Sequence, residues 1–245
     1  MRPLPGIVAL ACITLVAGSA AAQASPAEPC KSRSLAFDAA DAGWRHVSMS
    51  WLKRDTAYTL SREDGRTVLT ARAEGSASFY VAPLARPMSV PDTLSWSWKT
   101  DALVPGADNR DAKREDAPLR VVVAFDGDAS KLPAAERVKR KLAVAQSGSA
   151  PPYAMLMYIW GDKVAPETII ASAHSGQVKM LVVDSGSDGL GSWRTARRNL
   201  AADYRRAFGA EPGPVLSVGA LTDTDNTGAT ALGRYADFRI DCAAD

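Results

Sequence analysis

The feature that most constrains the fold is a repeated alternation of apolar and polar residues over short runs. In the run 94–99 (LSWSWK), Leu94, Trp96 and Trp98 fall on one side of an extended chain, and two serines and a lysine fall on the other. Such alternation is typical of a strand with one buried face. Gly, Pro and Asp separate the runs, as they separate strands in all-β proteins. The pattern predicts strands at 34–38, 45–51, 56–62, 66–73, 76–82, 93–100, 119–126, 153–160, 167–173, 177–184, 214–222 and 234–241.

A tight turn is predicted between the third and fourth of these strands. The connecting residues are Glu63-Asp64-Gly65-Arg66. The pair Asp-Gly readily takes the positive φ angles that a short hairpin turn requires. The two strands are therefore expected to pair as a hairpin.

Two segments have helical spacing instead. The segment 132–146 is charged, and its apolar residues recur every three or four positions at Leu132, Ala135, Val138 and Leu142. It predicts a surface helix in a long insertion.

The second helical segment, 193–208, has a more regular apolar face. Ser192 is a candidate N-cap and Gly209 a candidate C-terminal stop. The apolar face comprises Trp193, Ala196, Leu200, Tyr204 and Phe208.

These elements predict an all-β fold: a two-sheet antiparallel β-sandwich of jelly-roll type with two peripheral α-helices. No internal repeat or linker divides the sequence, so residues 34–245 are expected to form a single domain. Residues 23–33 are rich in small and polar side chains and predict a flexible lead-in.

The N-terminus resembles a secretory signal peptide. A positive start at Met1-Arg2 is followed by the apolar run 7–16 and by small residues at 18–22. Cleavage is expected after Ala22, so that residues 1–22 are removed and the protein is periplasmic or secreted. The alternative is an uncleaved N-terminal anchor. No second apolar run is long enough to span a bilayer, and no transmembrane segment is expected after cleavage.

Cysteine usage agrees with export. Cys12 would leave with the signal peptide, while Cys30 and Cys242 remain near the two ends of the mature chain. Exported proteins tolerate disulfides and rarely keep two idle thiols. A Cys30–Cys242 disulfide is predicted, stabilising the fold by about 4–5 kcal/mol in the chain-entropy model. The alternative is a pair of buried free thiols.

The charge balance argues against one class of partner. The chain has 29 basic and 27 acidic residues and a formal net charge of +2. A dedicated nucleic-acid binder would show a strong basic excess, so no nucleic-acid partner is expected.

Four segments together carry a family resemblance. They are 94–99 (LSWSWK), 115–125 (EDAPLRVVVAF), 197–209 (RRNLAADYRRAFG) and 221–228 (LTDTDNTG). Their order and spacing resemble the bacterial domain of unknown function 3047 family, over about residues 37–240. The resemblance implies an exported protein of uncharacterised function. The strand pattern is also similar, more loosely, to galactose-binding-like jelly rolls such as carbohydrate-binding modules.

The loop 223–228 (DTDNTG) is the most suggestive segment for binding. Alternating oxygen donors followed by glycine can wrap a hard cation such as Ca²⁺, which makes Asp223 and Asp225 candidate metal ligands. A second interpretation is a loop that binds a ligand or partner, in which Asn226 would join these two aspartates. A third is a turn held by its own Asp and Asn side chains. Apart from this possible calcium ion, no cofactor is expected.

A second candidate site lies at the predicted strand 119–126. Arg120 shares a face with Val122 and Ala124, and Asp116 precedes it closely. If that face is open, Arg120 and Asp116 could bind sugar hydroxyls or an anionic group. The alternative is a partly buried structural ion pair.

Three tryptophans are candidate stacking platforms for sugar rings, because an apolar ring face packs well on an indole. They are Trp96, Trp98 and Trp160, of which Trp160 ends a strand and is the one expected to be exposed. The alternative is that all three belong to the core.

The predicted helix 193–208 carries paired arginines, including Arg197 and Arg198. They could present a basic patch to an anionic glycan or to a protein partner. The alternative is a solvated face of a surface helix.

Motifs for catalysis are absent from the sequence. The two histidines show no triad order, and no HExxH, CxxC or phosphate-binding glycine loop occurs. A carboxylate pair for glycoside cleavage could be drawn from Glu115, Asp116, Asp223 and Asp225.

The sequence therefore favours a non-catalytic extracytoplasmic domain that binds carbohydrate or a cell-envelope polysaccharide. Its groove would comprise Trp98, Asp116, Arg120 and Trp160, with 223–228 at the rim. The alternatives are a glycan-active enzyme and an envelope assembly protein that docks through Arg197 and Arg198. The sequence leaves the oligomeric state open.

Overall fold

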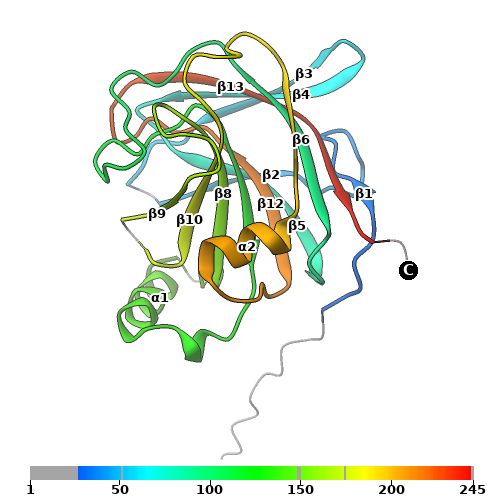
Figure 1. Cartoon of the computed structure of the whole chain (residues 1–245), viewed down its shortest axis with the longest axis vertical. Coiled ribbons are helices and arrows are strands. Elements are labelled where there is room, and N and C mark those ends of the chain that lie inside the picture. Colours follow the sequence, from blue (N-terminus) through cyan, green and yellow to red (C-terminus); the bar gives the residue numbers. More distant parts are fainter. Residues whose placement is uncertain (1–26, 51, 148–149, 174, 244–245) are drawn as a thin grey trace, which may run out of the picture.

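The computed structural model describes residues 27–50, 52–147, 150–173 and 175–243. The predicted signal peptide, residues 1–22, lies outside these described residues. Within them the chain folds into two packed β-sheets and two α-helices, as the alternation predicted (Figure 1).

The first sheet has six strands. Its order is β11 (Arg194–Arg198), β6 (Thr93–Thr100), β13 (Thr230–Asp241), β4 (Arg66–Glu74) and β3 (Ala57–Glu63). A short strand, β1 (Arg33–Ser34), pairs with the end of β13. β3 and β4 form the predicted hairpin, and Asp64 and Gly65 both have positive φ in its turn.

The second sheet has seven strands and carries the candidate site. Its order is β2 (Arg45–Ser48), β5 (Ser78–Met88), β12 (Val215–Leu221), β7 (Arg120–Phe125), β8 (Ala154–Gly161), β10 (Val178–Ser185) and β9 (Ile169–Ala171). All pairs are antiparallel except β8 with β10. That pair is parallel because the chain leaving β8 first forms the edge strand β9. It then turns back as β10, which lies between β8 and β9.

The core between the sheets is aromatic. It is filled by side chains from the facing strands of both sheets. Its largest fully buried side chains are Trp96, Trp98, Trp160, Tyr158, Tyr235, Phe125 and Phe238. The sandwich is therefore held by large rings, each of which removes much apolar surface from water.

The helices are α1 (Ala134–Ser147) and α2 (Leu200–Phe208). α1 confirms the predicted surface helix, and Gly209 ends α2 in the left-handed conformation, as predicted. The predicted start of the second helix is wrong. Its first residues form the edge strand β11 on β6, and Asn199, not Ser192, is the N-cap, accepting from the backbone N–H of Ala202 at 2.8 Å.

The two ends of the described chain are tied together. Cys30 and Cys242 form the predicted disulfide, across a sequence separation of 212 residues, beside the pairing of β1 with β13 (Figure 1). Stable structural disulfides are typical of oxidising compartments. None of the helices in the described part of the chain has both the length and the hydropathy needed to cross a bilayer.

Removing this disulfide should destabilise the domain. The double variant Cys30→Ser/Cys242→Ser should lose about 4–5 kcal/mol of unfolding free energy in urea, because the long closed loop no longer restricts the unfolded chain. Adding dithiothreitol should lower the wild type to the level of the variant and leave the variant unchanged. A loss below about 1 kcal/mol would show that the disulfide contributes little to folding.

Candidate functional site

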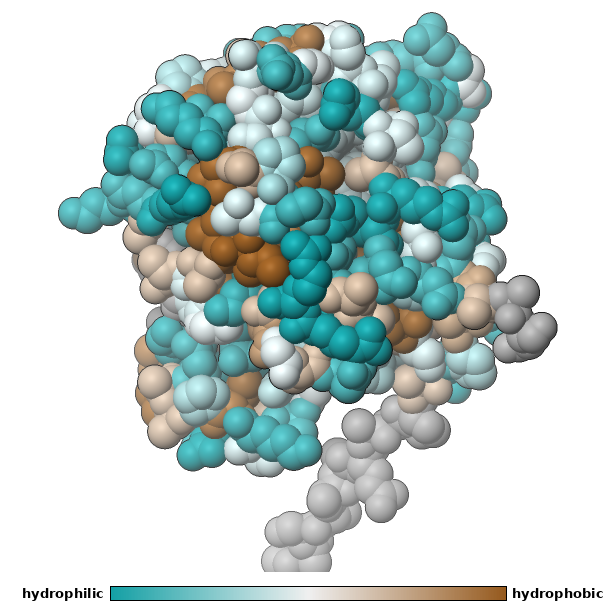
Figure 2. Space-filling model, in the orientation of Figure 1, coloured by the Kyte–Doolittle hydropathy of each residue, from teal (hydrophilic) through white to brown (hydrophobic). Residues whose placement is uncertain are grey.

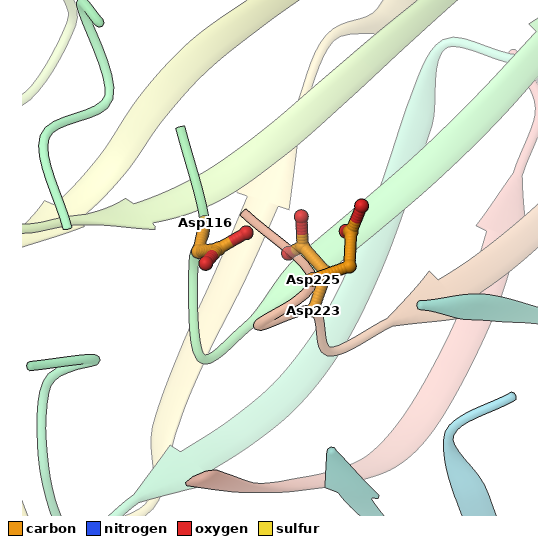
Figure 3. Close-up of side chains that lie close together, drawn as sticks. All are labelled: Asp116, Asp223 and Asp225. Atoms are coloured by element: carbon orange, nitrogen blue, oxygen red, sulfur yellow. The ribbon is translucent and has the colours of Figure 1, made fainter. Parts of the chain in front are cut away.

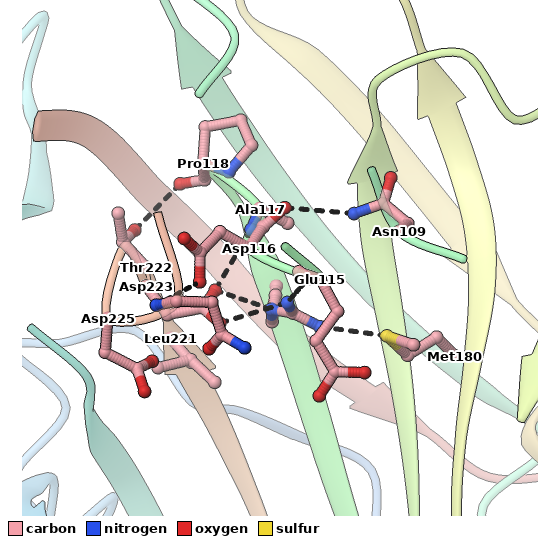
Figure 4. Close-up of polar contacts among 12 residues, drawn as sticks. Asn109, Glu115, Asp116, Ala117, Pro118, Met180, Leu221, Thr222, Asp223 and Asp225 are labelled. Carbon is pink, nitrogen blue, oxygen red and sulfur yellow. Dashed lines mark hydrogen bonds and ion pairs between the residues drawn. The ribbon is translucent and has the colours of Figure 1, made fainter. Parts of the chain in front are cut away.

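A buried ion pair stands at one end of the second sheet. Arg120 is the first residue of β7. Asp223 lies just after β12, the strand that pairs with β7 in the sheet. The guanidinium is bidentate: its Nε donates to one oxygen of Asp223 at 2.6 Å, and an Nη donates to the other at 3.0 Å (Figure 4). Both residues are buried. The predicted pairing of Arg120 with a carboxylate therefore exists, but its partner is Asp223 and not Asp116.

Further contacts fix Arg120 from several sides. Another Nη donates to the thioether sulfur of Met180 at 3.0 Å, and the guanidinium also donates to the carbonyl of Glu115. The backbone N–H of Arg120 donates to the hydroxyl of Tyr235 at 3.1 Å. Tyr235 belongs to β13 of the other sheet, so this contact joins the two layers at the site.

Asp116 organises the loop 223–228. One of its oxygens accepts from the backbone N–H of Asn226 at 3.2 Å, and the other accepts from the N–H and hydroxyl of Thr227 at 2.8 and 2.7 Å. Its side chain is buried in doing so. Asp116 therefore shapes the loop and has no free face toward solvent. This corrects its predicted direct contact with ligand.

Gly233 shows how closely β13 approaches this end of the sheet. A Cβ on Gly233 would lie 2.4 Å from the hydroxyl of Thr222 and 2.6 Å from the carbonyl of Pro118. Only glycine leaves room for that approach. The hydroxyl of Thr222 donates in turn to Pro118 at 2.8 Å, which closes the base of the loop.

Three aspartates of this region lie close together. Carboxylate oxygens of Asp116, Asp223 and Asp225 lie within 4.8 Å of one another (Figure 3). Burial raises the pKa of Asp223 to about 6; Arg120 opposes this rise and Asp116 adds to it. Burial also disfavours the charge on Arg120, but the carboxylate of Asp223 outweighs burial and raises the pKa of that guanidinium.

The predicted calcium site stays a prediction. Hard cations need free carboxylate oxygens. Here Arg120 binds both oxygens of Asp223, and the Nζ of Lys53 lies 2.5 Å from an oxygen of Asp225. A cation at this cluster would therefore have to displace donors that the protein supplies.

These side chains line the end of an open groove on the outer face of the second sheet. We call it the sheet groove. Its first part is a cavity of about 340 Å³ with Arg120, Asp223, Asp225 and Asn226 at one end. Lys53 and Glu115 complete this polar end. The floor is apolar and includes Phe79, Met155, Met157, Met180 and Leu221.

The groove continues across the sheet toward α1. A second cavity of about 340 Å³ shares Phe79 and Met155 with the first. Val122 and Ala124 of β7 lie on its floor, and Arg140 of α1 lies at its far end. The face of β7 that carries Arg120 is thus the open one, while Val121, Val123 and Phe125 enter the core.

The predicted tryptophan platforms are wrong. Trp96, Trp98 and Trp160 are all fully buried between the sheets. The indole N–H of Trp98 donates to Asp184 at 2.8 Å, and that of Trp160 donates to the carbonyl of Gly186 at 3.0 Å. Alternation placed these rings on one face but could not show that this face is the inner one. These rings pack in the core between the two sheets and cannot stack on a ligand.

The predicted basic helix is also wrong in its location. Arg197 and Arg198 lie on β11, and Arg198 is held by Asp203 and Glu167 at 2.7–3.1 Å. Arg206 joins Glu167 at 2.8 Å. Hydrophilic side chains cover α2, with a hydrophobic area beside them over β9 and β10 (Figure 2).

Arg198 therefore fastens α2 to the sandwich. The hydroxyl of Tyr158, in the core, also donates to Asp203 at 3.0 Å. Arg197 is different: its side chain is 70% exposed and lies 4.0 Å from Asp241. Docking through the arginine pair stays a prediction for Arg197, whereas the bonds of Arg198 are used within the fold.

Several groove residues were not foreseen. Met155 and Met157 alternate along β8 with Leu156 and Tyr158, so strand parity alone places these methionines on the face opposite the core residues. That signal was available in the sequence. Lys53 is different, because it meets Asp225 across 172 residues and no local pattern connects them.

Comparison with known families decides the membership of the chain. The model of a family described as protein of unknown function (DUF3047) matches residues 42–239. The chain belongs to this family. The match spans both sheets and includes Arg120, Asp223 and the loop 223–228, so the site described above lies within the family domain. A comparison with curated proteins gives no match.

Solved structures with a similar fold have very different sequences. The family 11 carbohydrate-binding module of the cellulosomal cellulase Lic26A-Cel5E of Clostridium thermocellum is 9% identical, with a TM-score of 0.46, over 90% of this chain and 98% of that one. The xyloglucanase domain of NopAA from Sinorhizobium fredii is 11% identical, with a TM-score of 0.41, over 82% and 94%.

The arginine network around Glu167 predicts an acid-dependent stability. Hydrogen bonds from Arg198, opposed by burial and reinforced by Arg206, lower the pKa of Glu167 to about 2. A lowered carboxyl pKa stabilises the fold above the ordinary value of 4.5, and this contribution is lost as the pH falls toward 2. Glu167→Gln should therefore lower the thermal midpoint at pH 7, and its difference from the wild type should shrink between about pH 4.5 and 2.

The matched control is Glu63→Gln, on the hairpin of the other sheet, which should melt like the wild type at pH 7. A gap between wild type and Glu167→Gln that is the same at every pH would contradict the role given to this carboxylate.

Proposed function

We propose that this chain is a non-catalytic binding domain that holds a carbohydrate, such as a cell-envelope polysaccharide, in the sheet groove. The observation that carries the proposal is the combination of an apolar floor with a cluster of hydrogen-bonding side chains at one end. Binding sites for small ligands typically have this composition.

The polar end matches the chemistry of sugar hydroxyls. A hydroxyl both donates and accepts hydrogen bonds. Asp225 and Glu115 supply acceptors, Lys53 supplies donors, and the amide of Asn226 supplies both. Asp225 and Asn226 are partly exposed, so they can reach a ligand, whereas Asp116 and the Arg120–Asp223 pair hold the loop in place behind them.

The floor matches the apolar face of a sugar ring. Phe79 is partly exposed on β5 and lines both cavities of the groove. Aromatic rings pack well against the C–H groups of a pyranose. Phe79 therefore takes the role first expected of Trp98 and Trp160, and the partly exposed Met155 beside it can adapt to the shape of the ligand.

The bonds that the acids make support a non-catalytic role. Asp223 is held by Arg120, and Asp116 is held by the loop backbone.

The second candidate is a glycan-active enzyme. It is favoured by one observation: oxygens of Asp223 and Asp225 approach within 4.8 Å, and the pKa of Asp223 is raised to about 6. Retaining glycosidases have carboxyl groups about 5 Å apart.

An extracytoplasmic location is part of the proposal. The Cys30–Cys242 disulfide supports an oxidising compartment. The signal-peptide pattern of residues 1–22 supports the same location.

Binding should be measured by calorimetry against soluble neutral, anionic and amino-sugar oligosaccharides. Phe79→Ala should weaken the binding of a ligand from this panel at least tenfold, about 1.4 kcal/mol, because it removes the aromatic floor. The control is Leu60→Ala, which removes an exposed apolar side chain from the other sheet and should leave the affinity unchanged.

Two outcomes would contradict the proposal. One is the absence of binding across the panel by folded wild-type protein. The other is release of reducing sugar that is abolished by Asp225→Asn, which would favour the enzyme.

A further inference from the structure

Helix α1 is attached to the domain by its polar face. Glu136 accepts from the hydroxyl of Ser175 at 2.9 Å, and Arg140 donates to the carbonyl of Pro151. Before the helix, Leu132 is buried and anchors the segment. α1 lies at the periphery of the molecule, next to the ends of β9 and β10 (Figure 1).

The apolar face of α1 therefore points into solvent. Val138 and Leu142, four residues apart on one helix face, are 61% and 59% exposed. Ala135, on the same face, is also exposed. An ordinary surface helix turns such a stripe toward the core. The reversed orientation leaves more than half of each of these two large residues exposed in the isolated domain.

Cations border the exposed stripe on both sides. Arg137, Lys139 and Lys141 are exposed and belong to the same two turns of helix. The one acid of α1, Glu136, is turned toward the body of the protein, where it also pairs with Lys139 at 3.0 Å. The outward face is thus apolar along its centre and basic along its edges.

We propose that α1 docks on an anionic lipid surface. Helices with an apolar stripe and basic flanks lie in the lipid interface, where the stripe enters the acyl boundary and the cations contact lipid phosphates. A second copy of this chain is a poorer partner, because pairing two such faces would place like charges together. This proposal is independent of the proposed function.

Docking would also orient the domain. Arg140 of α1 lines the second cavity of the sheet groove, so the groove ends next to the helix. With α1 on a membrane, that end of the groove would lie close to the lipid surface and its polar end farther away.

The test is vesicle co-sedimentation of the chain from Gln23, which lacks the predicted signal peptide and contains all the described residues. Vesicles of phosphatidylglycerol and phosphatidylcholine in equal parts are compared with pure phosphatidylcholine at low salt. We expect at least fivefold more bound protein on the anionic vesicles and loss of most of it in 0.5 M NaCl, because salt screens the basic flanks.

The stripe is tested separately by Val138→Ser/Leu142→Ser. This variant should bind anionic vesicles at least threefold less than the wild type, and the control Leu60→Ser, at an exposed site on the other sheet, should bind like the wild type. Thermal melting confirms that both variants are folded. Equal binding by the double variant, or equal binding to both kinds of vesicle, would overturn the proposal. So would a wild-type dimer that the double variant abolishes, if neither binds vesicles.

Discussion

The buried pair of Arg120 and Asp223 is the interaction on which the site depends. It joins the start of β7 to the loop that leaves β12, and the hydroxyl of Tyr235 ties the same point to the other sheet. A buried guanidinium needs such a partner, because an unpaired charge in the core is very costly. Asp116 then fixes the rest of the loop through backbone N–H groups. The polar end of the groove is therefore held in shape by bonds within the protein itself.

The two faces of the second sheet have different tasks. The inner face packs tryptophan and tyrosine rings against the first sheet, while the outer face leaves Phe79 and Met155 partly exposed in the sheet groove. At one end of this groove lies the charged loop, and at the other lies α1. The exposed stripe of α1 adds a second surface, so the groove proposed to bind carbohydrate and the helix face proposed to contact lipid lie beside the same sheet. Arg198, in contrast, uses its charge in bonds to Asp203 and Glu167 within the fold.

Local patterns predicted the strands, the Asp64-Gly65 hairpin, the disulfide and the sandwich, because each follows from strand parity, turn chemistry or compartment. Parity also placed Arg120 opposite the core. It placed Trp98 and Trp160 on one face of their strands, but an apolar face can pack against the other sheet or line an open groove, and the alternation is the same in both cases. The residues of β11 were assigned to a helix because the apolar residues of 193–208 recur at helical spacing. Their pairing with β6 is a tertiary contact that this spacing does not reveal. Partners distant in sequence, such as Lys53 with Asp225, leave no local signal.

The most direct test of this account is the unfolding free energy of Asp223→Ala, measured in urea at pH 7 beside Glu211→Ala. Glu211 is bound by Arg205 at the surface. Removing Asp223 leaves the buried Arg120 without its carboxylate partner, so the unfolding free energy should fall by about 3–5 kcal/mol. Removing Glu211 leaves a solvated arginine and should have a much smaller effect. A loss for Asp223→Ala no larger than for Glu211→Ala would contradict the claim that this pair holds the site together.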